Sequence, residues 1–138
     1  MTHRSRTILR RAAVTGLSLV AFGGASLAAA GSASAAGGNG VMESGEFGEY
    51  YNSDRAGCVW DLITADANFG DNWFVGSGCA GLGQDIDNNT ASYWNRQTVT
   101  WDVYTGTSRG GVKGWIPGGA YGNYSATFKN QVSSAYPR

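Results

Sequence analysis

An internal repeat constrains the fold of this chain more than any other feature of its sequence. Moving the sequence along itself by 41 residues, without a gap, brings several identical residues into one register. The identical pairs are Trp60/Trp101, Asp61/Asp102, Thr64/Thr105, Gly70/Gly111, Gly78/Gly119, Asn89/Asn130 and Ser92/Ser133. A unit this short cannot bury a sheet face alone, whereas two units can pack face to face. We therefore predict two repeat units, near 59–97 and 98–138, that share one core.

The local pattern of the chain is that of β-strands. Short stretches rich in β-branched and aromatic residues recur between glycines, and no window shows the 3.6-residue period of an amphipathic helix. The expected strands are 59–64, 72–75, 98–105, 112–116 and 133–136, with the segment 47–55 pairing at a sheet edge. Several short strands between turn signals predict an all-β sandwich.

The first 35 residues have the organisation of a secretory signal peptide. A basic start that contains the only histidine, His3, precedes an apolar run over 12–30, and Ala33-Ser34-Ala35 offers a small-x-small cleavage site. An uncleaved membrane anchor is the alternative, although Gly, Ser and Thr dilute the run. We expect a secreted protein that has no membrane contact after cleavage, with a flexible N-terminus over 36–45 and a folded domain over 46–138.

The charges of residues 36–138 exclude several classes of function. This part has six Lys or Arg, ten Asp or Glu and no histidine. An acidic chain without a basic run gives no electrostatic reason to bind nucleic acid. The lack of histidine removes the usual general base and the commonest zinc ligand. The near carboxylate pairs, Asp61 with Asp66 and Asp85 with Asp87, have no spacing that forces an opposed catalytic pair. We predict a monomer that is not an enzyme.

The two cysteines, Cys58 and Cys79, are expected to pair with each other. In an exported chain a disulfide is favoured over a free thiol, which would need an activating His or cation. Closing this loop is worth on the order of 3 kcal/mol by chain entropy.

Each predicted unit contains a strand, a tight turn with glycine, a second strand, and an Asn-rich corner that ends in Ser before a final aromatic strand. The corners read DNNTASYWN over 87–95 and FKNQVSSAY over 128–136. This arrangement resembles the βγ-crystallin Greek-key motif used twice, in which a corner serine bonds back to the hairpin. With the signal peptide and the cysteine pair, the chain from about Gly45 to Arg138 resembles the secreted actinobacterial proteins of peptidase inhibitor family I36. The resemblance implies a βγ-crystallin-like sandwich of two Greek-key motifs. It also implies an extracellular peptidase as partner, since the family is typified by an exported inhibitor of metallopeptidases.

Crystallin-type modules can bind calcium through the pattern Asn/Asp-Asn/Asp-x-x-Ser/Thr-Ser, and no other cofactor is expected here. The candidate ligands are Asn88, Asn89, Ser92, Asn130, Ser133 and Ser134. Both sites are damaged, because Tyr93 replaces the last Ser of the first and Lys129 begins the second. We expect weak calcium binding or none. The alternative is that these residues only cap the corners through hydrogen bonds to the backbone.

Two segments are candidates for contact with a peptidase. The stretch 116–124 mixes turn residues with tyrosines, so Pro117, Tyr121 and Tyr124 are expected on an exposed recognition loop. The disulfide-tied Cys58-Val59 segment could also face a peptidase, although we favour its role as the start of a core strand. The sequence thus predicts a secreted peptidase inhibitor that presents a rigid loop. The alternatives are a calcium-binding or structural crystallin-like module, or a secreted toxin or cell-wall-binding protein.

Overall fold

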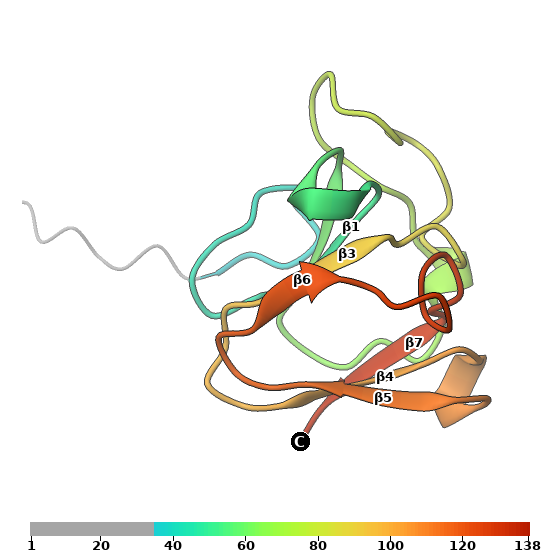
Figure 1. Cartoon of the computed structure of the whole chain (residues 1–138). Helices are drawn as coiled ribbons and strands as arrows, with labels where there is room; N and C mark the ends of the chain where they lie inside the picture. Colours follow the sequence, from blue (N-terminus) through green and yellow to red (C-terminus); the bar gives the residue numbers. More distant parts are fainter. Residues whose placement is uncertain (1–34) are drawn as a thin grey trace, which may run out of the picture. The chain divides into compact units, whose positions relative to one another are not determined.

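The computed structural model describes residues 35–138 as two antiparallel sheets around one core (Figure 1). The predicted signal peptide, apart from its last residue, lies outside the described residues. The first sheet has the order β2-β1-β3-β6, and the second has the order β5-β4-β7. Three short 3-10 turns lie in connections between strands of the same sheet. The strands and turns are β1 (Phe47–Tyr50), η1 (Ser53–Arg55), β2 (Val59–Leu62), η2 (Phe69–Asp71), β3 (Ser92–Asn95), β4 (Trp101–Tyr104), η3 (Thr107–Arg109), β5 (Lys113–Ile116), β6 (Tyr121–Asn123) and β7 (Ser134–Pro137).

Each half of the chain gives a strand segment to the sheet of the other half. β6 follows β5 in sequence but pairs with β3 in the first sheet. In the opposite direction, Asp66 follows β2 and forms a bridge with Ala135 in β7 of the second sheet. The all-β fold of two interlocked Greek-key motifs is therefore confirmed.

The backbone shows which residues of the two motifs are equivalent. Asp54, Arg55 and Gly57 after β1 have positive φ, as do Ser108, Arg109 and Gly111 after β4. The equivalent strands are therefore β1 and β4, then β2 and β5, then β3 and β7.

This pairing of strands does not match the predicted repeat with its gapless shift of 41 residues. The prediction of that shift is therefore wrong. Trp60 lies in β2, whereas Trp101 begins β4 and is the counterpart of Phe47. The first motif therefore starts at β1, which lies between β2 and β3 and not at a sheet edge. A gapless shift fails because the connection over 70–87 in the first motif is much longer than its counterpart over 125–129. The first unit, predicted over 59–97, therefore has to begin at β1, whereas β4 to β7 of the second motif lie within the predicted 98–138.

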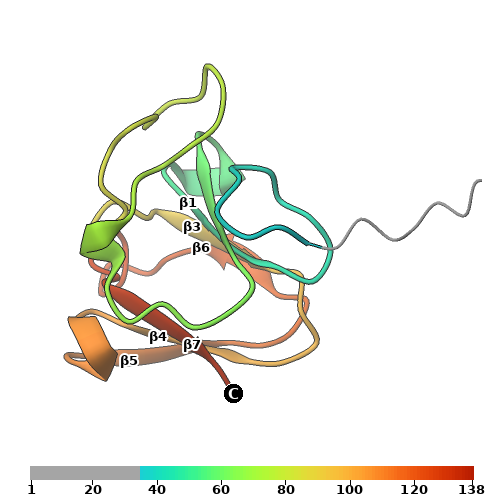
Figure 2. The same cartoon turned by 180° about the vertical axis from the view of Figure 1, so that it is seen from behind.

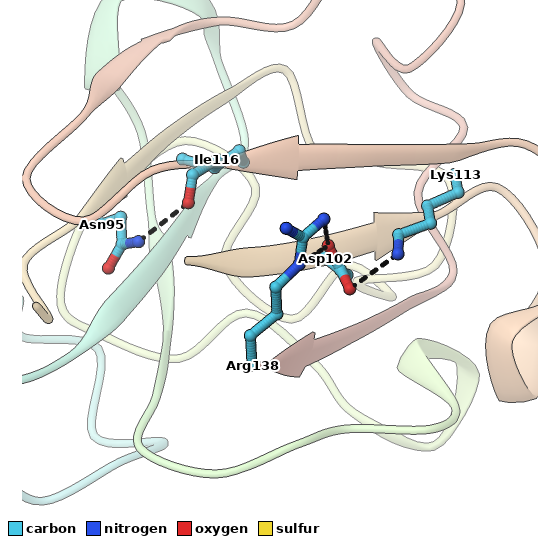
Figure 3. Close-up of polar contacts among 5 residues, drawn as sticks. All are labelled: Asn95, Asp102, Lys113, Ile116 and Arg138. Atoms are coloured by element: carbon cyan, nitrogen blue, oxygen red, sulfur yellow. Dashed lines mark hydrogen bonds and ion pairs between the residues drawn. The ribbon is translucent and has the colours of Figure 1, made fainter. Parts of the chain in front are cut away.

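The core is built from aromatic and branched side chains contributed by both motifs. The equivalent residues Phe47 and Trp101 stack on each other, with their ring centroids 4.6 Å apart and their planes 9° apart. Asn95 at the end of β3 donates its side-chain amide to the carbonyl oxygen of Ile116 in β5, at 3.0 Å, and so ties the two sheets together (Figure 3). The two motifs therefore stabilise each other, as the short-unit argument requires.

The segment 36–45, which we expected to be flexible, is fixed against the first sheet (Figure 2). The buried carboxylate of Asp61 accepts hydrogen bonds from the backbone amides of Asn39, at 3.1 Å, and Gly40, at 2.7 Å. The amide of Gly45 donates to the carbonyl of Arg96. The glycine-rich sequence of 36–45 has no periodicity from which this contact could be predicted. The segment is held because its backbone amides donate to the carboxylate of Asp61, which would otherwise be buried without hydrogen-bond partners. In the described part of the chain no helix could cross a membrane.

Candidate functional site

The connection over 70–87 is the main addition that the first motif makes to the fold. Figure 1 shows it in yellow-green, standing out from the two sheets. The sequence predicted a strand at 72–75, but the structure has no strand there and forms only an isolated bridge between Trp73 and Asp85. We name residues 70–87 the stapled loop. Its length and projection make it available to a partner.

The stapled loop is held at several points along its length. The predicted disulfide between Cys58 and Cys79 is present, and the Cys58 amide donates to the carbonyl of Ala80 at 2.9 Å. The Phe74 amide donates to the carbonyl of Gln84 at 2.9 Å. The side chains of Phe74 and Ile86 are buried in the core. A loop with these restraints loses little conformational entropy when it binds.

Gly81 shows how closely the stapled loop packs against the first motif. Its φ is +88°, and a Cβ at this position would lie 2.2 Å from the ring of Tyr51. Tyr51 in turn meets Phe74 edge to face, with the ring centroids 5.5 Å apart. Glycine is therefore required at position 81 for both the backbone conformation and the contact.

Two large apolar side chains project from the stapled loop into solvent. Trp73 is 58% exposed and Leu82 is 50% exposed. Cys58 and Val59, in contrast, are buried, so this segment begins a core strand and cannot face a peptidase. Exposed apolar residues on a restrained loop are typical of contact sites for another macromolecule.

The predicted recognition loop over 116–124 is corrected by the structure. Tyr124 is buried and donates its hydroxyl to Oε1 of Glu49 at 2.6 Å. Tyr121 is exposed but belongs to β6, and the guanidinium of Arg55 lies 4.1 Å from its ring centroid. Pro117 lies in an exposed turn. The three residues do not form one surface, because the strand exchange places the end of β6 against the core.

Glu49 is a buried carboxyl that sequence reasoning missed. The side chain of Glu49 points from β1 into the core, where its carboxyl accepts a hydrogen bond from the hydroxyl of Tyr124. Burial raises the pKa of Glu49 from 4.5 to about 8, although the hydrogen bond from Tyr124 opposes this shift. The same burial raises the pKa of Tyr124. The alternation of FGEY in β1 offered a signal, because Glu49 occupies a face shared with Phe47.

The corner serines lock the hairpins, as the resemblance implied. The Oγ of Ser92 donates to the carbonyl of Asn52 at 2.6 Å and accepts from the amide of Arg55 at 2.9 Å. In the second motif it is Ser134 that donates to the carbonyl of Gly106, at 2.7 Å. The counterpart of Ser92 is therefore Ser134 and not Ser133.

The calcium candidates lie where the two corners meet. The amide of Asn88 donates to the carbonyl of Val132 at 3.2 Å, and the amide of Asn130 donates to the carbonyl of Thr90 at 2.8 Å. Ser133 Oγ lies 3.5 Å from Asn88 Oδ1, so the structure brings these two candidates together. Asn89 instead donates its side-chain amide to the carbonyl of Asp85 at 2.8 Å.

The observed register changes which residues occupy the equivalent corner positions. Lys129 is the counterpart of Asp87, and Ser133 is the counterpart of Ala91. The first corner therefore lacks a hydroxyl at the fifth position, and the second corner has a cation at the first. Within residues 35–138 no three His, Cys, Asp or Glu side chains gather at one point. These features favour the capping role of the Asn and Ser residues over a strong calcium site.

A hollow of about 380 Å³ beside β2 is lined by one of the two carboxylate pairs considered for catalysis, Asp61 with Asp66. Its lining includes Trp60, Asp61, Asp66 and Asp71. Asp61 is engaged by backbone amides, while Asp66 accepts from the amide of Asn68 at 3.0 Å and from the side chain of Asn72 at 2.9 Å. Burial raises the pKa of Asp66. The carboxylates of Asp61 and Asp66 already accept hydrogen bonds that hold nearby backbone and side chains in place. These bonds argue against their use as a catalytic general acid and general base.

Comparisons with known proteins agree with the fold. A domain from a structure described as "Evolution of the eye lens beta-gamma-crystallin domain fold" aligns with a TM-score of 0.56 and 14% identity, covering 75% of this chain and 93% of that chain. The N-terminal domain of Protein S aligns with a TM-score of 0.51 and 20% identity, covering 67% of this chain and 94% of that one. No protein-family model and no curated protein matches the sequence. The chain therefore has a βγ-crystallin-like fold, which does not by itself define an activity.

Proposed function

We propose that this chain is a secreted, monomeric, non-enzymatic inhibitor of an extracellular peptidase, and that the stapled loop is its contact segment. The observation that carries the proposal is the exposure of Trp73 and Leu82 on a loop that a disulfide and two core anchors hold in place. Large apolar side chains on a rigid support are the residues from which binding energy is expected. The resemblance to peptidase inhibitor family I36 supports the same reading. The signal-peptide pattern of the first 35 residues supports secretion.

The test is a titration of the purified chain against a metallopeptidase, a serine peptidase and a cysteine peptidase. Inhibition of one class is expected, and Trp73→Ala should weaken it by at least tenfold, in line with the truncation of an aromatic contact residue. Trp115→Ala is the matched control, because Trp115 is equally exposed but lies on the second sheet. No inhibition of any class at micromolar excess would remove this proposal.

A structural or calcium-binding crystallin-like module is the second candidate, and the fold favours it. Reciprocal backbone hydrogen bonds join the two corners and give them a structural role. A thermal melt with and without calcium separates the two functions, because a ligand that binds only the folded state raises the melting temperature. A rise of many degrees, together with no peptidase inhibition, would favour the calcium module. A secreted toxin or cell-wall-binding protein remains the third expectation from the sequence.

A further inference from the structure

The outer faces of the two sheets differ in how their aromatic rings are covered. On the first sheet, Arg55 and Arg96 lie over the ring of Trp94, at 4.9 and 4.7 Å from its centroid, and Arg55 also covers Tyr121. On the second sheet, Trp115 of the edge strand β5 is 66% exposed. Its neighbours in sequence, Gly114 and Ile116, are buried, so the indole of Trp115 points away from the core. Trp115 therefore offers an open ring to solvent.

Trp115 belongs to a row of side chains that crosses the second sheet. Asp102 in β4 is opposite Trp115 on one side and opposite Tyr136 in β7 on the other. Because neighbouring strands are about 4.8 Å apart, the two aromatic residues are separated by about 10 Å. The guanidinium of Arg109 lies 4.1 Å from the ring centroid of Tyr136. A polymer lying across the sheet can therefore touch an open indole at one end and an arginine at the other.

The centre of this row is positively charged despite its carboxylate. Lys113 Nζ lies 3.0 Å from Asp102 Oδ2, and Arg138 Nη2 lies 2.9 Å from Asp102 Oδ1 (Figure 3). About half of each cationic side chain remains exposed, whereas Asp102 is nearly buried. The two cations hold Asp102 in place and still present hydrogen-bond donors to solvent.

The outer face of the second sheet carries more cations than carboxylates, although residues 35–138 as a whole are acidic. This part of the chain has six Lys or Arg and ten Asp or Glu. Three of the six cations, Lys113, Arg109 and Arg138, lie on the outer face of the second sheet, together with the carboxylate of Asp102. A local excess of positive charge on an acidic protein indicates an anionic partner.

We propose that the row Trp115, Asp102 and Tyr136, with its cations Lys113, Arg138 and Arg109, is a binding site for an acidic polysaccharide, that is, a chain of sugar rings that carry carboxylate groups. The apolar face of a sugar ring stacks on the open indole of Trp115. Carboxylates of the polymer bind Lys113 and the guanidinium groups, and hydroxyls are within reach of the same donors. A polyanion without sugar rings would not stack on Trp115, and a neutral glycan would have no carboxylates to bind the cations. This site is separate from the stapled loop.

The experiment is a calorimetric titration of the chain with hyaluronan oligosaccharides, an acidic glycan, at low and high salt. We expect binding that weakens as salt is raised, because exposed charges are screened. Trp115→Ala should weaken the binding by about tenfold, and Lys113→Gln should weaken it by roughly threefold at low salt. Both side chains are exposed, so neither substitution removes a core contact.

Matched variants elsewhere on the surface control for general effects of ring or charge. Trp73→Ala removes an indole of similar exposure from the stapled loop, and Lys129→Gln removes an exposed cation from the second corner. Both should bind hyaluronan as the unmodified chain does, even though Trp73→Ala is expected to lose peptidase inhibition. The two proposals can therefore fail independently.

Several results would overturn the acidic-polysaccharide site. One is the absence of binding to hyaluronan at millimolar concentration. A second is unchanged binding by Trp115→Ala, together with full competition by inorganic polyphosphate, which would indicate simple ion exchange. A third is equal affinity for neutral chitin oligosaccharides with no effect of Lys113→Gln, which would mean that the cations take no part.

Discussion

Replacement of the buried carboxyl of Glu49 by an amide should make the protein more stable at neutral and alkaline pH. The pKa of Glu49 rises from 4.5 to about 8 because burial disfavours the charged carboxylate. The folded state therefore binds the Glu49 proton more tightly than the unfolded state does. The stability that this proton contributes is complete below pH 4.5, and it is lost as the pH rises through 8. Glu49→Gln cannot ionise, and its amide oxygen can still accept the hydroxyl of Tyr124.

The size of the effect follows from the two pKa values. Each unit of difference corresponds to about 1.4 kcal/mol, so the unmodified protein loses about 3 kcal/mol by pH 7 and somewhat less than 5 kcal/mol by pH 8.5. Glu49→Gln should not show this loss. Since small domains are stable by only about 5–15 kcal/mol, the difference between the two proteins should be large.

Urea unfolding at pH 5, 7 and 8.5, followed by tryptophan fluorescence, measures this difference. Glu49→Gln and the unmodified chain should be similar at pH 5, and the variant should be the more stable by about 3 kcal/mol at pH 7. Glu43→Gln, at a less buried position, is the control for loss of one negative charge. Equal pH dependence of the unmodified chain and Glu49→Gln would refute the argument that Glu49 is held protonated in the core.

Three further substitutions test the supports of the fold and of the stapled loop. Ser92→Ala removes both hydrogen bonds of a corner lock and should cost about 1–3 kcal/mol in a denaturant melt; a cost within error would mean that the serine does not hold the hairpin. Gly81→Ala should destabilise clearly more than Gly83→Ala, since both have positive φ but only the first Cβ would meet a neighbouring ring; equal melting temperatures would contradict this. Replacing Cys58 and Cys79 with serine should cost about 3 kcal/mol and increase proteolysis within 70–87; unchanged protection of the loop would show that its core anchors suffice.

The sequence was sufficient to predict the fold class but not the register of the repeat. Alternating strands, glycine turns and corners that end in serine are local signals, and the lock at Ser92 formed as expected. The alignment of Trp60 with Trp101 assumed connections of equal length in both motifs. An insertion such as 70–87 breaks that assumption, and aromatic and glycine residues are frequent enough here to match by chance. A comparison that allowed gaps would have aligned the turn after Tyr50 with the turn after Tyr104.

The candidate sites were harder to predict because exposure depends on the exchange of strands between sheets. The turn-rich segment around Tyr124 reads as an exposed loop, yet the pairing of β6 with β3 brings this ring against Tyr93, with the centroids 4.9 Å apart. No spacing in the sequence made Asp61 part of a catalytic pair, but there was also no sign that this carboxylate accepts from amides of a distant segment. The disulfide was predictable, because a chain with two cysteines allows a single intramolecular pairing.

The two motifs share their buried framework and differ at their surfaces. Position 102 of the second motif is an aspartate, and its counterpart in the first is Gly48, so Arg138 is held by a carboxylate whereas its counterpart Arg96 stacks on an indole. The hairpin turns and corner locks must be kept in both motifs because each sheet depends on them. Residues on the outer faces and in the connections are not needed to hold the sheets together and can therefore differ between the motifs. The first motif accordingly has the stapled loop, and the second has the exposed indole of Trp115 among cations. The positions where equivalent residues differ are therefore where binding functions of this fold should be sought.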